Sequence, residues 1–185
     1  DLFNHLERTG APMMPKDIGL LVGHTGVAGG DRVLDAGTGT GVLAAYLGRM
    51  GADVTTYEQD PDFAEVAREN MALAEVADTV EVRTGDLTDA LGDLSNFDVL
   101  TLDTADAPTV VSEAPELLVS GGFLAVYSPF IEAAREVELA AREAGLGDVE
   151  TVETIQRRMD FDDRGSRPQT AGVGHTGYLT FARMA

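Results

Sequence analysis

The 185-residue chain has the length of one domain, and its 44% hydrophobic content is enough to build a single buried core. It contains no cysteine, which excludes disulfides and thiolate metal sites and is typical of a reducing cytoplasm. The formal net charge of −19 disfavours nucleic-acid binding at low ionic strength, and the sequence has neither a bilayer-spanning apolar run nor a signal peptide. We therefore expect no membrane partner and no metal site.

Short β-rich runs alternate with helical patterns along the chain, which is typical of β-α-β units and a mostly parallel sheet. After an N-terminal segment at 1–30, the pattern predicts a catalytic domain at 31–185, with helices at 40–50, 61–76, about 108–118 and 130–144. No helix is predicted between the last two strands, so these two should pair antiparallel. The predicted strands cover 31–37, 53–59, 79–85, 97–103, 122–128, 147–159 and 176–184.

Five parallel strands closed by an antiparallel pair differ from the six parallel strands of a nicotinamide-binding domain. The arrangement resembles the α/β fold of the Rossmann-like class I S-adenosylmethionine-dependent methyltransferases. In that fold a seven-stranded, mostly parallel sheet carries an antiparallel C-terminal strand.

A glycine-rich loop, "DAGTGTG" at 35–41, follows the first predicted strand and opens the first helix of the domain. Gly37 and Gly39 permit a tight turn with close backbone approach, and Gly41 lets the helix start against the strand. A dinucleotide fingerprint would place its last glycine at position 42, where this chain has Val42. The spacing is the one associated with S-adenosylmethionine, which has no pyrophosphate to bind.

Acidic residues follow the next three predicted strands, where the carboxyl ends of parallel strands meet at one crevice. Glu58 is placed to accept hydrogen bonds from both ribose hydroxyls, and Asp86 to accept one from the adenine amine of the cofactor. Phe63 could also touch that adenine, although its helical stripe is mostly core. The predicted cofactor contacts are Asp35, Gly37, Thr38, Gly39, Thr40, Gly41, Val42, Leu43, Glu58, Phe63, Asp86, Leu87 and Asp103.

The charge balance favours a protein adapted to molar salt, where the Debye length falls to about 3 Å and self-repulsion is screened. Lys16 is the only lysine of the chain. The basic residues are densest near the C-terminus, where they could bind the phosphates of a nucleic acid or balance neighbouring aspartates; these are Arg157, Arg158, Arg164 and Arg167.

Four stretches, "PMMPKDIGLLV", "VLDAGTGTG", the "LD" ending at 103 and "RPQTAGVGHTGYLTFAR", resemble the tRNA (adenine-N1)-methyltransferases of archaeal type that modify the T-loop. The resemblance covers essentially the whole chain, and the "PKD" and "HTGYL" motifs are its most selective parts. It implies a tRNA substrate, S-adenosylhomocysteine as product, a cytoplasmic location and a homotetramer. Because family members also carry a small N-terminal β domain, we expect that domain to be missing from this chain.

The resemblance also implies that adenine N1 attacks the sulfonium methyl group directly, so that positioning supplies much of the catalysis. Asp103, as the catalytic residue, would accept a hydrogen bond from the adenine 6-amino group, or would orient the methionine amine of the cofactor. The target base must be exposed and held in a pocket. Candidate walls of that pocket are Met13, Met14, Arg167, His175, Thr176 and Tyr178; of these, His175 could equally be a packed residue at a strand start.

Two positions depart from the family pattern. Met14 stands where the family often has tyrosine, and "TADAPTV" replaces a Pro-Trp pair after the catalytic aspartate. Three alternatives therefore stay open: a protein-L-isoaspartate methyltransferase, a small-molecule methyltransferase, and a non-catalytic RNA-binding subunit that keeps the fold.

Overall fold

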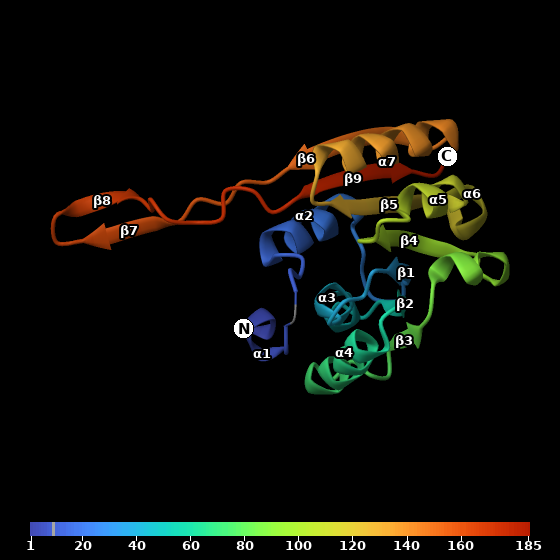
Figure 1. Ribbon diagram of the computed structural model, residues 1–185, viewed down its shortest axis with the longest axis horizontal. Coiled ribbons are helices and arrows are strands. Elements are labelled where there is room, and N and C mark those ends of the chain that lie inside the picture. The colour runs from blue at the N-terminus through green and yellow to red at the C-terminus, as the bar shows by residue number, and fades with distance from the viewer. Residues whose placement is uncertain (9) are drawn as a thin grey trace.

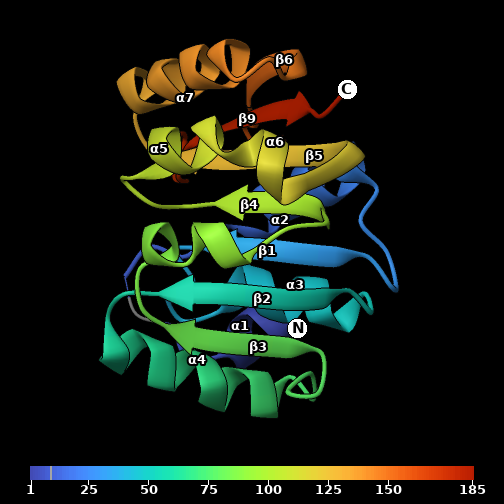
Figure 2. The same cartoon turned by 90° about the vertical axis from the view of Figure 1, so that its right-hand side faces the viewer.

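The computed structural model describes residues 1–8 and 10–185. Its main sheet has seven strands in the order β3-β2-β1-β4-β5-β9-β6, as Figures 1 and 2 show. Only β9 runs antiparallel to its neighbours, β5 and β6, so the predicted mostly parallel sheet with an antiparallel C-terminal strand is confirmed. The strands are β1 Arg32–Ala36, β2 Asp53–Glu58, β3 Val80–Thr84, β4 Phe97–Leu102, β5 Leu118–Ser128, β6 Gly147–Glu153 and β9 Tyr178–Arg183.

The helices form a layer on each face of the sheet, and each layer encloses its own buried core. Adjacent residues of β1 point to opposite faces, so Val33 joins one core and Leu34 the other. The first core packs beneath α1 Leu2–His5, α2 Pro15–Thr25, α3 Val42–Arg49 and α4 Pro61–Leu73; the second packs beneath α5 Ala107–Ser112, α6 Ala114–Leu117 and α7 Ile131–Glu143. None of the helices described is long and apolar enough to cross a bilayer.

Three predicted elements were wrong in detail, and two of them meet at Leu118. The helix expected at about 108–118 is split into α5 and α6, because Pro115 lacks the amide hydrogen that would continue the first helix into the second. Strand β5 then begins at Leu118, earlier than predicted, since Leu118 pairs with Phe97 across a register shift. The N-terminal segment also contains α1 and α2, which the sequence pattern did not predict.

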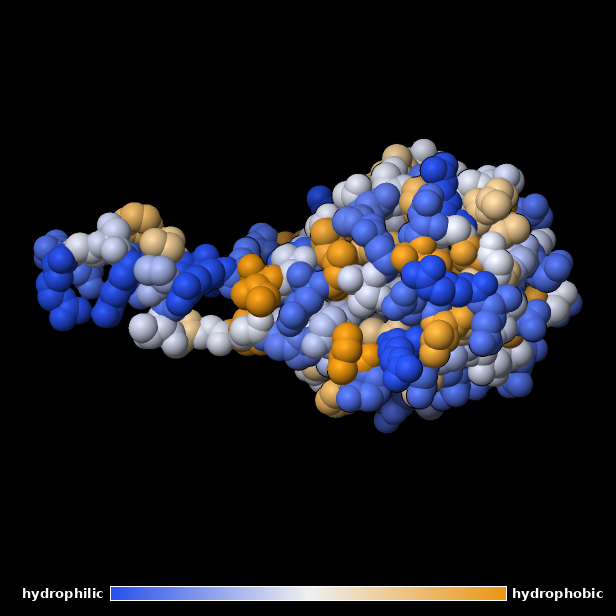
Figure 3. Space-filling view, turned by 90° about the horizontal axis from the view of Figure 1, so that it is seen from above, coloured by the Kyte–Doolittle hydropathy of each residue, from blue (hydrophilic) through white to orange (hydrophobic). Residues whose placement is uncertain are grey.

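The strand expected at 147–159 ends at Glu153, and the chain then leaves the sheet as a projecting hairpin. This arm consists of β7 Met159–Asp162 and β8 Gly165–Pro168, which pair antiparallel, and Figure 1 shows it extending far from the body. Its side chains have little to pack against: Phe161 is 77% exposed and Met159 is 48% exposed. The apolar colouring on the arm and at its root is visible in Figure 3.

Candidate active site

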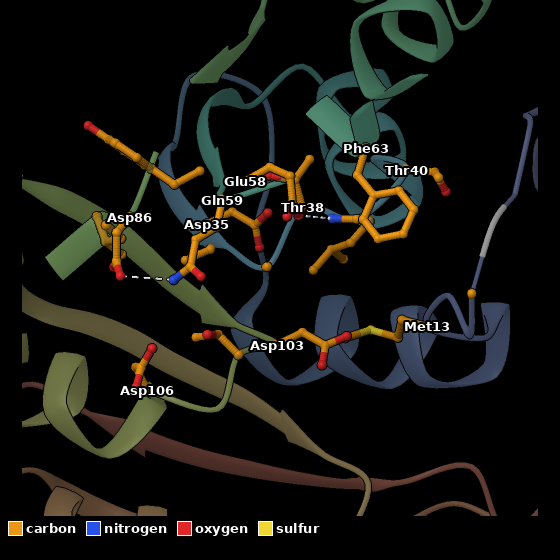
Figure 4. Close-up of a pocket in the computed structure, with 18 of the residues that line it drawn as sticks. Met13, Asp35, Thr38, Thr40, Glu58, Gln59, Phe63, Asp86, Asp103 and Asp106 are labelled. Atoms are coloured by element: carbon orange, nitrogen blue, oxygen red, sulfur yellow. Dashed lines mark hydrogen bonds between the residues drawn. The ribbon is translucent and has the colours of Figure 1, made fainter. Parts of the chain in front are cut away.

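A cavity of about 320 Å³ lies at the carboxyl ends of the parallel strands, where the sequence predicted a cofactor site. Its walls come from the glycine loop, from the ends of β2, β3 and β4, and from residues 10–13 of the N-terminal segment, as the close-up in Figure 4 shows. All the predicted cofactor contacts line it except Gly41. Gly41 has a φ of +79° and faces α4, where an added Cβ would lie 2.6 Å from the Met71 methyl group.

The glycine loop touches the end of β4 directly. Gly37 has a φ of +84°, and an added Cβ there would lie 2.0 Å from the carbonyl oxygen of Asp103. The Gly39 amide donates a 2.7 Å hydrogen bond to Oε2 of Glu58. The loop thus touches two of the strand ends that carry acids. Steric fit excludes a side chain at Gly37, whereas Gly39 has open space around an added Cβ and differs by its left-handed backbone, with a φ of +53°.

Glu58 is held at the cavity wall by the backbone around it. Its Oε1 accepts a hydrogen bond of 3.0 Å from the Asp60 amide, while Oε2 accepts from Gly39. Each carboxylate oxygen has a second lone pair, so both remain able to accept hydrogen bonds from a pair of ligand hydroxyls.

Asp86 lies at the end of β3 and is held by neighbouring donors. Its Oδ1 accepts from the Thr88 amide at 2.8 Å and from the Thr88 hydroxyl at 2.7 Å, and its Oδ2 accepts from the Gln59 side-chain amide at 2.9 Å. The sequence pattern did not single out Gln59, although it directly follows Glu58, nor Asp106, which lines the same cavity. The position of Gln59 depends on the pairing of β2 with β3, and that of Asp106 on where α5 begins after β4.

Asp35 is buried, Asp103 is half-buried, and the two carboxylates differ in their partners. The Asp35 carboxylate accepts hydrogen bonds from the hydroxyls of Thr56 and Thr101 and so ties β1 to β2 and β4 beneath the loop. None of the described residues donates a hydrogen bond to the Asp103 carboxylate. Burial, assisted by the charges of Asp35 and Glu58, raises the pKa of Asp103 to about 7.

Thr40, also in the glycine loop, has a buried hydroxyl without a hydrogen-bond partner among the residues that the structure describes. Its carbonyl oxygen accepts a 2.8 Å hydrogen bond from the Asn70 side chain on α4. Asn70 also binds both backbone groups of Glu7, at 2.9 Å and 2.8 Å. The loop and the N-terminal segment over it are therefore joined through one buried side chain.

The residues around the cavity fit S-adenosylmethionine. Five carboxylates line it, namely Asp35, Glu58, Asp86, Asp103 and Asp106, and none of the described lining residues is basic. Such a wall suits a ligand with a sulfonium and an ammonium group and would repel a pyrophosphate. The adenosine moiety has two hydroxyls and an amine to donate, which matches the acceptors of Glu58 and Asp86.

Two of the predicted substrate residues lie away from the root of the arm, which we define as the segments 154–158 and 169–177 that join the arm to the sheet. Met14 and Thr176 line a second cavity of about 490 Å³, together with Arg157 and Arg158. Arg167 lies on β8, out on the arm. Met13 lines the first cavity instead.

His175 is bonded at the surface and is not packed inside the protein. Its Nδ1 lies 2.6 Å from Oε1 of Glu153, and its Nε2 lies 2.9 Å from the Pro129 carbonyl oxygen. These two acceptors raise the pKa of the imidazole, with the Pro129 carbonyl as the larger cause. His175 also lies against Tyr178, with ring centroids 4.9 Å apart.

A cavity with this charge, on a sheet whose last strand alone is antiparallel, defines a methyltransferase that depends on S-adenosylmethionine. The family described as "tRNA methyltransferase complex GCD14 subunit" matches residues 5–166, and the chain belongs to this family.

Individual relatives agree with the family. The chain is 32% identical over 213 aligned residues to the tRNA (adenine(57)-N(1)/adenine(58)-N(1))-methyltransferase TrmI of Methanocaldococcus jannaschii, covering 100% of this chain and 75% of that protein. The crystal structure of tRNA (m1A58) methyltransferase TrmI from Aquifex aeolicus superposes with a TM-score of 0.90 at 25% identity, covering 100% and 74%. A protein-L-isoaspartate O-methyltransferase of Methanoculleus marisnigri is 35% identical over 138 residues, which are 75% of this chain and 60% of that protein.

Substituting Glu58 by alanine should weaken binding of S-adenosylhomocysteine by about 10- to 100-fold, because ribose hydroxyls would lose a charged acceptor worth about 1.5–3 kcal/mol. Calorimetric titration in about molar KCl measures this. Asp53→Ala is the matched control, since Asp53 is an exposed carboxylate at the opposite end of the same strand. Equal affinities for the two variants would contradict the placement of the ribose at Glu58.

Proposed function

We propose that the protein transfers a methyl group from S-adenosylmethionine to N1 of an adenine in the tRNA T-loop, at position 57 or 58. The observation that carries this proposal is the similarity along the whole chain to an enzyme with that name. It extends through the "HTGYL" motif and the arm root, which a methyl-donor site alone would not require.

In the proposed reaction the chain's own residues bind, orient and stabilise charge. When bound, S-adenosylmethionine supplies an electrophilic methyl group on a positive sulfur and leaves as S-adenosylhomocysteine. Glu58, Asp86 and the loop hold the nucleoside part. Asp103 accepts a hydrogen bond from the adenine 6-amino group, whose positive charge grows as N1 is alkylated, and its partial desolvation strengthens this interaction. Its competing role would be to orient the methionine amine.

We place the target nucleotide between the two cavities, with Met14, His175 and Thr176 beside the base and Arg167 on tRNA phosphates. The support for this is the position of Met13 and Met14, neighbours in the chain that line different cavities. Arg157 and Arg158 at the arm root supply positive charge there, which fits a phosphate backbone.

The proposal is tested by incubating the protein with labelled S-adenosylmethionine and unmodified tRNA in about molar KCl, then mapping the modified nucleotide. We expect label in 1-methyladenosine at position 57 or 58. Label in isoaspartyl peptides and none in tRNA would assign the chain to the second candidate, which its similarity to a protein-L-isoaspartate O-methyltransferase favours. Cofactor binding without transfer to tRNA or to these peptides would indicate a non-catalytic subunit.

We further propose a homotetramer that works in the cytoplasm at high salt. The excess of 32 acidic over 13 basic residues supports the salt adaptation, and the exposed apolar side chains of the arm support self-association.

Phe161→Ser should therefore lower the assembly state, because it removes the most exposed aromatic side chain of the arm. Light scattering after gel filtration in about molar KCl measures the mass. Leu139→Ser is the matched control, since Leu139 is 49% exposed on α7 and distant from the arm. A wild-type monomer, or an equal change in both variants, would refute the role of the arm.

A further inference from the structure

The two most selective motifs of the sequence, "PKD" at 15–17 and "HTG" at 175–177, meet in one partly buried cluster. The Lys16 ammonium lies 2.7 Å from Oδ1 of Asp17 and 2.7 Å from Oγ1 of Thr176. It also lies 2.6 Å from the Thr154 carbonyl oxygen. The Thr176 hydroxyl in turn donates to Oδ2 of Asp17 at 2.8 Å. Residues that are 160 positions apart in the chain are thus bonded directly.

The two charged side chains of the cluster are largely buried. The Lys16 side chain is 9% exposed and the Asp17 side chain 2% exposed. An ammonium group has three donors, and each of them finds an acceptor here. A buried ion pair is stable only when its remaining donors and acceptors are satisfied in this way. In a chain with a single lysine, this position requires the compact, three-way geometry of an ammonium group, which a planar guanidinium cannot reproduce.

The residues that bind Lys16 lie on both chain segments that connect the arm to the sheet. Thr154 follows the last residue of β6, and Thr176 precedes the start of β9 by two residues. Lys16 and Asp17 lie in the first turn of α2, directly after the methionines that line the two cavities. One cluster therefore fixes the outgoing strand, the returning strand and the helix that carries the predicted pocket walls.

Tyr127 on β5 binds the cluster through the backbone of Thr176. Its hydroxyl donates to the Thr176 carbonyl oxygen, and its ring covers Gly177, where an added Cβ would lie 2.4 Å from the ring. Burial raises the pKa of Tyr127, and the charges of Asp17 and Asp103 add to this effect although the hydrogen bond to Thr176 opposes it. Tyr127 thus lies within electrostatic range of both carboxylates.

We propose that Lys16 is a positioning residue: together with Asp17 and Thr176 it holds the root of the arm, and with it the substrate wall, in register with the methyl-donor site. For the identity of the substrate this inference rests on the proposed function. The inference predicts that the cluster affects substrate placement and leaves cofactor binding intact, because no member of the cluster lines the first cavity.

The test compares Thr176→Val, which removes the hydroxyl but keeps the side-chain shape, with Thr176→Ser, which retains it. A Lys16→Met/Asp17→Asn double variant removes both charges without leaving a buried carboxylate unpaired. In Thr176→Val and the double variant we expect hydrogen exchange at 154–158 and 174–177 to rise at least about tenfold. The kcat/KM for tRNA should fall about 100-fold, while the Kd for S-adenosylhomocysteine stays within about twofold. Thr176→Ser should restore both readouts.

The matched control is Arg142→Met, which breaks a surface ion pair of α7 with Glu138 and contacts neither cavity. It should leave hydrogen exchange at the arm root, the kcat/KM for tRNA and the Kd for S-adenosylhomocysteine unchanged. Unchanged exchange in the cluster variants, or an equal loss of cofactor affinity, would overturn the inference. If the wild type does not methylate tRNA, the proposed function fails, whereas exchange at the arm root still decides whether the cluster holds it.

Discussion

Asp103→Asn should lower the single-turnover rate of methyl transfer by about 100- to 1,000-fold, which is the usual cost of removing one preorganised charge-stabilising group. The asparagine keeps the shape of the side chain and can still accept a hydrogen bond, but it offers no negative charge to the alkylated adenine. The Kd for S-adenosylhomocysteine should change little. A loss of cofactor affinity as large as the loss of rate would instead place Asp103 on the methionine amine.

The same substitution makes a pH-dependence prediction with a definite sign. The pKa of Asp103 is about 7 in the folded protein, so the wild-type kcat/KM for tRNA should fall as the pH drops through 7, because the protonated carboxyl carries no charge. The asparagine variant should lack this limb of the profile. A wild-type profile that stays flat between pH 6 and about pH 8 would contradict the assignment.

The stability of the variant provides the control for misfolding. Since the folded-state pKa of about 7 exceeds the ordinary value of 3.8, the unfolded chain loses this proton first, and stability falls as the pH rises between the two values. Asp103→Asn should therefore be more stable than the wild type at pH 8, by up to about 4 kcal/mol, and equally stable near pH 4. Urea unfolding at both pH values measures this.

Gly37→Ala should destabilise the protein by about 3–5 kcal/mol and weaken S-adenosylhomocysteine binding at least about tenfold. Two causes add: a left-handed backbone with a φ of +84° costs about 1–2 kcal/mol in a residue with a side chain, and the methyl group would lie 2.0 Å from a backbone oxygen that cannot retreat without moving β4. Chemical denaturation and calorimetry in the same buffer measure the two effects.

Gly26→Ala separates these causes. Gly26 ends α2 with a φ of +66° and has nothing within 4 Å of an added Cβ, so its substitution should cost only about 1 kcal/mol and leave cofactor affinity intact. If the two variants are equally stable, the close approach of the glycine loop to Asp103 adds nothing measurable to the loss of stability.

The sequence predicted the sheet and the grouping of the strand-end acids around one cavity, and the reason is geometrical. In a parallel sheet the carboxyl ends of all strands meet at one edge, so a glycine loop and three strand-end acids could be assigned to one crevice from their spacing alone. Short-range sequence signals also predicted α4 and α7 closely, as Pro61 does for the start of α4, whereas α2 was not predicted. These features depend on neighbours within one β-α unit.

The features that the sequence did not reveal depend on contacts between distant segments. The continuous pattern at 147–159 contains both a sheet strand and part of an arm, and what separates them is the point where β9 ceases to pair with β6. The Gln59–Asp86 hydrogen bond likewise follows from the pairing of β2 with β3. A sequence pattern shows how apolar residues repeat along a helix or strand. The residue at which that helix or strand ends is decided by the segment it pairs or packs with.

The sequence by itself determined the class of fold, the anionic character of the methyl-donor cavity and the residues around it, because the alternation of strands and helices brings strand ends together whatever the side chains are. Only the tertiary structure decided that Lys16 and Thr176 share one partly buried cluster and that burial raises the pKa of Asp103 to about 7. It also decided that Arg167 lies on the projecting arm, with Arg157 and Arg158 at its root. Burial and ion pairing arise from the neighbours that folding supplies, and a linear pattern contains no record of those neighbours.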